Sequence, residues 1–200
     1  GKSNTAIGLL LNENYGYDKV FKGDRIFIFA PNPDADEKMN VLIEHKDIPD
    51  GNLFTDIDML EELYDMLVED FKQRKRNEEP IYPSLIIVDD FGSSGRLSKR
   101  FGQLAKVFMN SRKFQISIMV LAQTYTSVSK NVRTQANGMF IWNTTNKELE
   151  TIEKENNFME SKNEFMNMFR SNVKQTHDFI VVNYTNKFGE LYLDKNFEII

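Results

Sequence analysis

The chain opens with three residues that could hold a phosphate group, Gly1-Lys2-Ser3. They match the end of the phosphate-binding pattern G-x-x-x-x-G-K-[ST]. In that pattern glycine lets the backbone approach the phosphates, lysine neutralises the β- and γ-phosphate oxygens, and the hydroxyl binds Mg²⁺. The apolar residues that follow have helical spacing, and the positive end of a helix also attracts phosphate. We therefore expect Gly1, Lys2, Ser3 and Asn4 to bind a nucleotide, with Ser3 also a metal ligand.

This tripeptide is a weak signal by itself, because so short a pattern often occurs by chance. The first glycine of the pattern, and the strand that normally precedes it, are not in the sequence. We therefore expect the numbering to begin inside a longer protein. If it does not, nucleotide binding would be badly weakened.

Two adjacent carboxylates follow a wholly apolar segment, residues 85–88. A continuous apolar run is typical of a parallel strand that is covered on both faces. Asp89, which follows that run directly, is the predicted ligand of Mg²⁺ or its water shell. Asp90 is the predicted general base, which orients or deprotonates an attacking water. A plain strand-ending turn is the alternative, because Asp and Gly are common in turns, but the tripeptide upstream favours the metal-and-base interpretation.

Three further polar residues flank a second apolar segment, residues 115–122. Gln123 follows it, and ligands bind beyond the carboxyl ends of strands in sheets of this class, so Gln123 could contact the γ-phosphate or the water. An amide that binds loop backbone is the alternative for this residue. Arg112 precedes the segment and Arg133 follows it. Either could be an arginine finger that stabilises transition-state charge in a neighbouring subunit, although a lone arginine is more often a surface residue.

The predicted elements that position these residues alternate between strands and helices, which indicates an α/β fold with a mostly parallel sheet in three layers. In the longest expected helix, residues 55–76, Thr55 and Asp58 are placed as a capping box. With 40% hydrophobic residues, the 200-residue chain suffices for one well-buried domain, residues 1–200. The other expected helices are 97–108, 147–156 and 162–169, and the expected strands are 25–30, 85–88, 115–122, 140–142, 179–184 and 190–193.

Composition excludes several classes of protein. The sequence has no cysteine, no signal-like amino terminus and no apolar run long enough to span a bilayer, so neither secretion nor membrane insertion is indicated. His45 and His177 are far apart and have no cysteine companions, which argues against a zinc site. The net charge of −5 argues against a protein that coats nucleic acid indiscriminately.

The charge is nevertheless segregated along the chain. Residues 91–147 contain no Asp or Glu and nine Lys or Arg, which leaves 16 basic and 30 acidic residues elsewhere. The middle segment therefore carries +9 and the rest −14. In an arbitrary protein, a run of basic residues like this one would be explained by helix faces that are exposed to solvent.

The order GKS, LIIVDDF, SRKFQISIMVLAQT and NVRTQANGMFI resembles that of the FtsK–HerA superfamily of P-loop ATPases. Within it, the sequence is most similar to the genome-packaging ATPase of poxvirus-like large DNA viruses and virophages. The resemblance implies a RecA-like fold, ATP and Mg²⁺ as cofactors, and a homo-oligomeric ring that drives double-stranded DNA through its centre. It also implies capsid or portal components as partners, and the host cytoplasm, viral factory or virion as the location.

The resemblance extends to individual positions. One departure is Asp90, because many P-loop motors have Glu at that place. The resemblance also suggests that the basic segment, residues 91–147, faces a neighbouring subunit or the central channel. Four of its side chains could then contact DNA phosphates: Arg96, Lys99, Arg100 and Lys106. The remaining matches are Lys2 and Ser3 in the phosphate loop, Asp89 and Asp90 as metal and catalytic carboxylates, Gln123 as the strand-end glutamine, and Arg112 as the arginine before that strand.

Two other functions compete with the ATPase. A GTPase-type switch is suggested by the D-x-x-G pattern of residues 89–92 and by Asn146-Lys147, which begin an N-K-x-D pattern. However, Leu149 stands where the guanine-reading carboxylate belongs. Asp90-Phe91-Gly92 also resembles a kinase metal motif, but no H-R-D motif precedes it. The second alternative is a structural protein that has the P-loop fold but binds no nucleotide. Measuring nucleotide binding by a protein with a completed phosphate loop would distinguish it from the ATPase.

Overall fold

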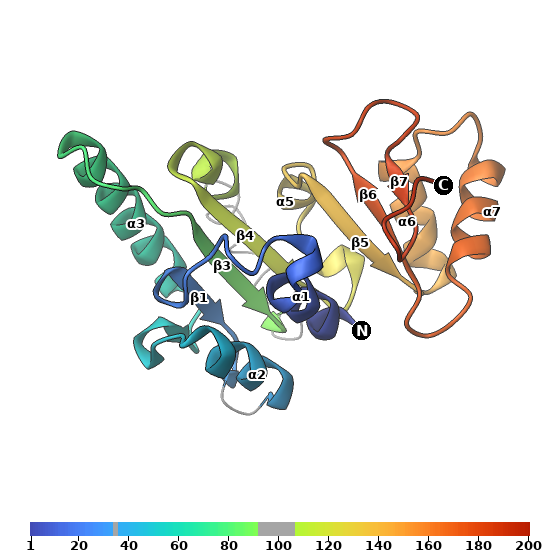
Figure 1. Ribbon diagram of the computed structural model, residues 1–200. Coiled ribbons are helices and arrows are strands. Elements are labelled where there is room, and N and C mark those ends of the chain that lie inside the picture. The colour runs from blue at the N-terminus through green and yellow to red at the C-terminus, as the bar shows by residue number, and fades with distance from the viewer. Residues whose placement is uncertain (34–35, 92–106) are drawn as a thin grey trace. The chain divides into compact units, whose positions relative to one another are not determined.

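The structure, a computed structural model, describes residues 1–33, 36–91 and 107–200 (Figure 1). The chain divides into two compact units. The first unit consists of Lys2–Gln123 with Ser127–Val132, and the second of Thr124–Thr126 and Arg133–Ile200 with Gly1. That the two units belong to one P-loop ATPase domain stays a prediction.

The first unit contains a parallel four-stranded sheet in the order β2-β1-β3-β4. The two central strands, β1 and β3, are almost entirely apolar and buried, as expected for parallel strands that are covered on both faces. The register aligns their carboxyl ends at one edge of the sheet, with Phe29 beside Val88 and Val88 beside Val120. The strands are β1 (Ile26–Phe29), β2 (Leu53–Phe54), β3 (Ser84–Asp89) and β4 (Ile116–Leu121).

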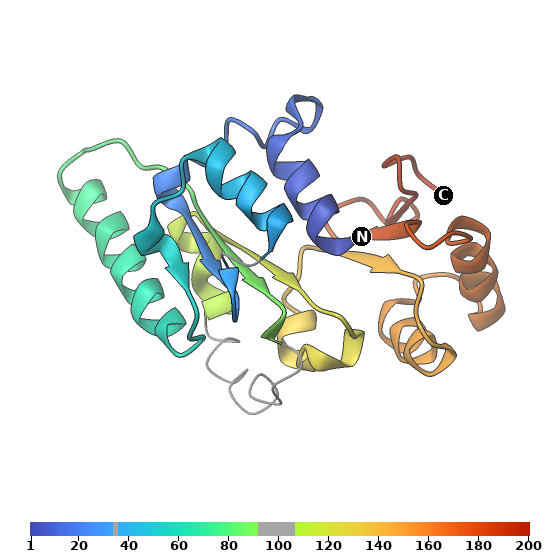
Figure 2. The same cartoon turned by 90° about the horizontal axis from the view of Figure 1, so that it is seen from below.

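Helices cover both faces of this sheet, and Figure 2 shows α1 and α2 together on one of them. Alternate residues of β1 point to opposite faces, because side chains alternate along a strand. Ile26 and Ile28 pack with α1 and α2, whereas Phe27 and Phe29 pack with α3. The predicted α/β fold in three layers with a mostly parallel sheet is therefore confirmed. The helices are α1 (Lys2–Leu11), α2 (Glu37–Lys46) and α3 (Met59–Arg76).

The predicted start of the longest helix is wrong. Helix α3 begins at Met59, and Asp58 at its N-cap makes no side-chain capping bond. Instead Asp56 accepts a hydrogen bond from the Asp58 backbone N–H at 3.0 Å, which holds the preceding turn. This Asx-type turn competes with helix formation, so the predicted capping box of Thr55 and Asp58 does not form.

The second unit contains an antiparallel sheet in the order β5-β6-β7. One face of this sheet packs on α6 and α7, through Ile141, Ile180 and Val182. The other face carries an aromatic cluster that includes Trp142 and Phe179, whose ring centroids are 5.3 Å apart. The last three strands were predicted correctly as strands, but they form their own antiparallel sheet. The elements are β5 (Gly138–Trp142), α6 (Asn146–Asn156), α7 (Lys162–Asn172), β6 (Phe179–Asn183) and β7 (Tyr192–Leu193).

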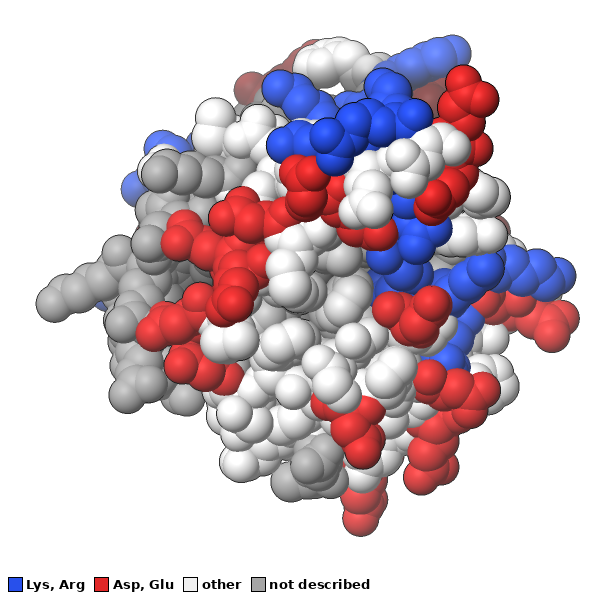
Figure 3. Space-filling model, turned by 90° about the vertical axis from the view of Figure 1, so that its left-hand side faces the viewer, with Lys and Arg blue, Asp and Glu red and all other residues white. Residues whose placement is uncertain are grey.

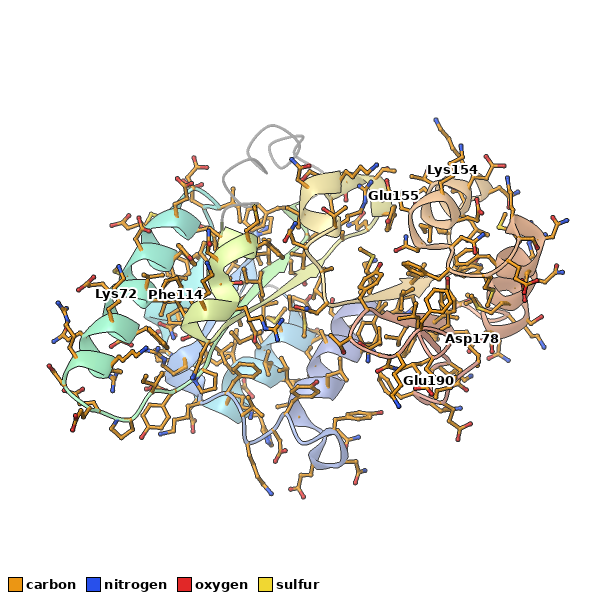
Figure 4. The ribbon with its side chains drawn as sticks, turned by 90° about the horizontal axis from the view of Figure 1, so that it is seen from above. Lys72, Phe114, Lys154, Glu155, Asp178 and Glu190 are labelled. Atoms are coloured by element: carbon orange, nitrogen blue, oxygen red, sulfur yellow. The ribbon has the colours of Figure 1, made fainter. Side chains whose placement is uncertain are left out.

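Asp178, which directly precedes β6, ties together the two ends of the second unit's hairpin (Figure 4). Its carboxylate accepts hydrogen bonds from Lys195 Nζ at 2.7 Å, from the Gln175 N–H at 2.9 Å and from the Lys174 N–H at 3.2 Å. The hydrogen bond from Lys195, followed by that from the Gln175 backbone, lowers the pKa of Asp178. The ionised carboxylate therefore stabilises the folded state at neutral pH.

We expect Asp178→Asn to lower the free energy of unfolding at neutral pH. A depressed carboxyl pKa contributes stability above the unfolded-state pKa of about 3.9, and this contribution is lost as the pH falls through the folded-state pKa. The difference between wild type and variant should therefore vanish in acid below that pH, as measured by denaturant unfolding at a series of pH values. Glu190→Gln, at an exposed position of the same unit, is the matched control. If the difference in the free energy of unfolding between wild type and Asp178→Asn persisted unchanged in acid, the stabilising role of the ionised Asp178 carboxylate would be contradicted.

Candidate functional site

Polar residues from two neighbouring strands meet at the carboxyl edge of the first unit's sheet. Asp89 ends β3 opposite Leu121, which ends β4. Gln123 lies two residues beyond β4, and its Nε2 donates a hydrogen bond to Asp90 Oδ1 at 2.6 Å. The Asp90 backbone N–H points to the Leu121 carbonyl at 3.4 Å. Two of the predicted site residues, 33 positions apart in the sequence, are therefore in direct contact.

The backbone of Asp90 is in the left-handed region, with φ of 53°. Asp and Asn tolerate this conformation better than most residues with a Cβ atom, but it is uncommon. Such conformations occur frequently in functional sites, where the surrounding structure holds them. At Asp90 the hydrogen bond from Gln123 fixes the carboxylate of an exposed side chain.

The carboxylate of Asp89 is half-buried, and three charged side chains act on it: Asp36, Asp90 and Lys2. Burial, followed by the charges of Asp36 and Asp90, raises the pKa of Asp89, whereas the Asp90 backbone N–H and the Lys2 ammonium lower it. Lys2 is therefore close enough to Asp89 to act on its charge. The charges of the predicted phosphate-loop lysine and the predicted metal carboxylate thus interact with each other.

The opening tripeptide leads directly into α1. Lys2 and Ser3 form the first turn of this ten-residue helix and are half-buried, while Gly1 and Asn4 are exposed. The first backbone N–H groups of a helix have no partner within the helix and carry partial positive charge. This end of α1 therefore combines an ammonium, a hydroxyl and helix N–H groups, which together suit a phosphate.

Asp36 is a site residue that the sequence analysis did not identify. It is the N-cap of α2, where its Oδ1 accepts from the Lys38 N–H at 2.9 Å and from the Met39 N–H at 3.4 Å. Its charge acts on Asp89 more strongly than that of Asp90 does. The sequence signal was an Asp placed to cap a helix after the proline-rich loop that follows β1.

Asp89 and Ser3 are the oxygen donors that could hold Mg²⁺ together with a nucleotide. Within residues 1–33, 36–91 and 107–200, no three or more His, Cys, Asp or Glu side chains are arranged to hold a metal ion. Mg²⁺ commonly takes one or two carboxylates together with substrate phosphates and water. A cation would also relieve the repulsion that raises the pKa of Asp89.

The two candidate arginine fingers lie in different settings. Arg112 is exposed on a short turn, Ser111–Phe114, that precedes β4. Since β4 has six residues and Gln123 lies beyond its far end, about 20 Å of strand separates Arg112 from the carboxyl edge. Arg112 therefore lies far from the carboxyl edge of its own sheet.

Arg133, by contrast, is held within the second unit. Its side chain is 9% exposed, and its Nη2 lies 2.7 Å from Glu155 Oε1. Its Nε donates to Glu155 Oε2 at 3.0 Å, which makes the pair bidentate. Burial alone would lower the pKa of Arg133, but the hydrogen bond to Glu155 and the charge interactions with Tyr125 and Glu155 together outweigh it, and the net shift is upward.

The four predicted DNA contacts, Arg96, Lys99, Arg100 and Lys106, and most of the expected helix 97–108 lie outside the described residues. Leu149, at the position where a GTPase needs a carboxylate, is buried in the core of the second unit at 3% exposure. A guanine base could not be recognised there.

Comparison with known proteins identifies the family. The family model described as Poxvirus A32 protein matches residues 23–192, a range that includes Asp89, Asp90 and Gln123 but not the opening tripeptide. No curated protein matches the chain. In the part of the chain that the structure describes, no helix is long and apolar enough to cross a membrane. The chain belongs to the poxvirus A32 family, whose members are viral genome-packaging ATPases of the FtsK–HerA-like P-loop class.

Proposed function

We propose that the protein is an ATP-driven double-stranded DNA translocase that packages a viral genome into the capsid. In this proposal ATP is hydrolysed at Mg²⁺-dependent sites between the subunits of a homo-oligomeric ring. The observation that carries it is the hydrogen bond from Gln123 to Asp90, next to a carboxylate, Asp89, on which Lys2 acts. This arrangement has the parts that phosphoryl transfer to water requires.

Each residue has one role in the proposed reaction. Lys2 neutralises the phosphate oxygens, while Ser3 and Asp89 would hold Mg²⁺, which would supply further positive charge to the phosphates. The water oxygen attacks the γ-phosphorus as the bond to the β-phosphate oxygen breaks. Asp90 accepts the proton of that water, and Gln123 orients the Asp90 carboxylate. The products are ADP and inorganic phosphate.

Arg112 is the proposed arginine finger. Its exposure and its distance from the carboxyl edge of its own sheet both favour action on a neighbouring subunit. Arg133 was the other candidate, but its bidentate ion pair with Glu155 would have to break before it could reach a phosphate. Breaking a buried ion pair leaves an uncompensated charge and is costly.

DNA contact is proposed for the middle segment of the chain, through Arg96, Lys99, Arg100 and Lys106. Figure 3 shows a face of the molecule on which basic and acidic side chains lie next to one another. At the end of α3, for example, Arg74 pairs with Asp70 and Arg76 with Glu69, both at 2.9 Å. These carboxylates compete with DNA phosphates for the guanidinium groups. The end of α3 is therefore a weaker candidate for DNA contact than the middle segment.

Replacing Arg96, Lys99, Arg100 and Lys106 together by Glu should abolish the stimulation of ATPase activity by duplex DNA, while basal activity remains. The reason is that the change reverses four charges that would bind DNA phosphates. ATP hydrolysis is measured with and without duplex DNA at several salt concentrations. Replacing Lys72, Arg74, Lys75 and Arg76 by Glu gives a matched control at the end of α3. Unchanged stimulation in the first variant would remove the proposed contact surface.

The site of action would be the host cytoplasm or viral factory, with capsid or portal components as further partners. ATP is the proposed nucleotide, and the buried Leu149 argues against a guanine-specific switch. A structural protein that retains the fold without nucleotide is the remaining alternative. Direct binding of labelled ATP separates this alternative from the ATPase, because a nucleotide-free protein would not bind it.

A further inference from the structure

The turn between β6 and β7 carries the most exposed large apolar side chain in the described part of the chain. This side chain is Phe188, which is 83% exposed. The turn is Lys187–Glu190, and a hydrogen bond from the Glu190 N–H to the Lys187 carbonyl closes it at 3.0 Å. Gly189 has φ of 91°, the positive value that a type II turn needs at its third residue. Phe188 therefore occupies the second position of a defined turn, and its ring lies in solvent.

Hydrogen bonds hold this turn to the strands on either side of it. The Asn183 side chain donates to Asn186 Oδ1 at 2.9 Å and accepts from the Thr185 hydroxyl at 2.7 Å. Asn186 Nδ2 in turn donates to the carbonyl of Glu190, which Figure 4 labels, at 2.9 Å. A preorganised loop loses little conformational entropy when it binds a partner. The hairpin thus presents Phe188 rigidly, in the manner of an interface anchor.

The first unit has an apolar groove between α1 and α2, with a volume of about 420 Å³. Figure 2 shows the two helices side by side. Val41 of α2 is 52% exposed there, while Ile7 and Leu11 of α1 are half-buried and pack against the core beneath. An exposed apolar surface with a polar rim is typical of an interaction site. The other residues that line the groove are Asn4, Gly8, Asn12 and Lys38.

Gly8 keeps part of this groove open. A Cβ atom at this position would meet no atom within 4 Å, so the space beside the helix backbone is free. Glycine is unfavourable inside a helix, because it loses more backbone freedom on folding than any other residue. Its place on this face of α1 therefore has a steric use, since it lets a partner approach the helix backbone closely.

The charged residues beside the hairpin turn and beside the groove are complementary. Phe188 lies between Lys187 and Glu190, and both of these are exposed. The groove has Lys38 on its α2 side and the exposed Glu13 beyond the end of α1. With Phe188 in the groove, Glu190 can pair with Lys38. Lys187 can likewise pair with Glu13. Opposite charges at the rim of an interface steer association and fix its register.

We propose that Phe188 of one chain inserts into the groove between α1 and α2 of a second copy of this chain. A second copy is the favoured occupant, because the chain itself supplies an aromatic anchor with matching charges. The contact needs only that each surface is exposed on its own unit. Because the two surfaces differ, the association is head-to-tail, which produces rings or filaments. The inference rests on the homo-oligomeric ring of the proposed function and names the surfaces that join its subunits.

The test measures self-association by sedimentation velocity at a series of protein concentrations, with and without ATP. Phe188→Ala removes the anchor and should weaken self-association about 10- to 30-fold, since aromatic anchors dominate interface energies. Phe188→Leu keeps an apolar side chain and should retain most of the affinity. Gly8→Leu fills the groove with a good helix former and should weaken association to a similar extent as Phe188→Ala. Its matched control is Gly51→Leu, because a Cβ atom there also meets no atom within 4 Å but lies outside the groove.

A mixture of the two defective variants gives the sharpest result. Gly8→Leu still has Phe188, and Phe188→Ala still has an open groove, so one intact contact can form between them. We expect a one-to-one complex and no larger species. Failure of the mixture to associate would overturn the proposal, and so would undiminished self-association of either single variant.

If Gly8→Leu does not fold, Val41→Glu places a charge in the groove at an exposed position, and undiminished self-association of that variant overturns the proposal. A wild-type chain that stays monomeric at every concentration would assign the groove to another partner. That result overturns both this inference and the ring of the proposed function. Association through these surfaces without ATP hydrolysis would support this inference and refute the proposed reaction alone.

Discussion

Asp90→Asn is expected to reduce kcat for ATP hydrolysis by about 10²–10⁴-fold while ATP binding is retained. The substitution removes the base that accepts the proton of the attacking water. It leaves a carbonyl oxygen that can still accept the hydrogen bond from Gln123, and Asn tolerates the left-handed backbone of this position. Steady-state turnover gives kcat, and titration with a fluorescent ATP analogue gives the dissociation constant.

Asp47→Asn is a matched control for that experiment. Asp47 is an exposed residue that follows α2 and is also left-handed, with φ of 51°. The control makes the same chemical change at the same backbone conformation but outside the site, so kcat should be unchanged. Full turnover by Asp90→Asn would show that another group accepts the proton.

Lys2→Ala is expected to weaken ATP binding by about 10–100-fold. Hydrogen bonds to charged groups contribute roughly 1.5–3 kcal/mol, and the Lys2 ammonium is the group proposed to neutralise the phosphate oxygens. The dissociation constants of ATP and ADP are measured by titration, and the loss should be larger for ATP, which carries the γ-phosphate.

Lys38→Ala gives the comparison for that effect, because it removes an exposed cation from the first turn of the neighbouring helix α2. ATP affinity should then be nearly unaffected. An equal loss in the two variants would mean that the effect comes from general electrostatic attraction, and the phosphate role of Lys2 would be wrong.

The positions of the buried strands and their polar ends could be predicted because the signal is local. A parallel strand covered on both faces is a continuous apolar run; residues 85–88 form such a run, and residues 115–122 are apolar except for Gln115 and Ser117. Asp90 was assigned to the attacking water and Gln123 to the γ-phosphate or that water, and the two side chains are hydrogen bonded at the carboxyl edge of the sheet. The three-layer fold follows from the same pattern.

The features that were missed depend on contacts between distant residues. Helix α2 was not predicted, because its few apolar residues stand among charged ones. The electrostatic effect of Asp36 on Asp89 requires the pairing of β1 with β3, which no local pattern encodes. Likewise, the sequence around Arg133 gives no sign of Glu155, 22 positions away, and so could not tell an arginine finger from a structural ion pair.

The last strands show a third limit. An apolar run such as β5 or β6 indicates a strand but not the direction of its partner. The prediction of one mostly parallel sheet included these last strands in it. In the structure β5, β6 and β7 instead pair antiparallel in a sheet of their own. Strand direction depends on how the helices between the strands pack, which is a tertiary property.

The strand order of the first unit also has a consequence for synthesis on the ribosome. None of the pairs in β2-β1-β3-β4 is a hairpin, and β3 must find β1 across α2 and α3. Pairing between segments so far apart in sequence is slow, because loop-closure entropy is lost before the contacts form. While β4 is still being synthesised, the apolar β3 therefore lacks one of its final neighbours, and its unpaired edge favours aggregation of the nascent chain.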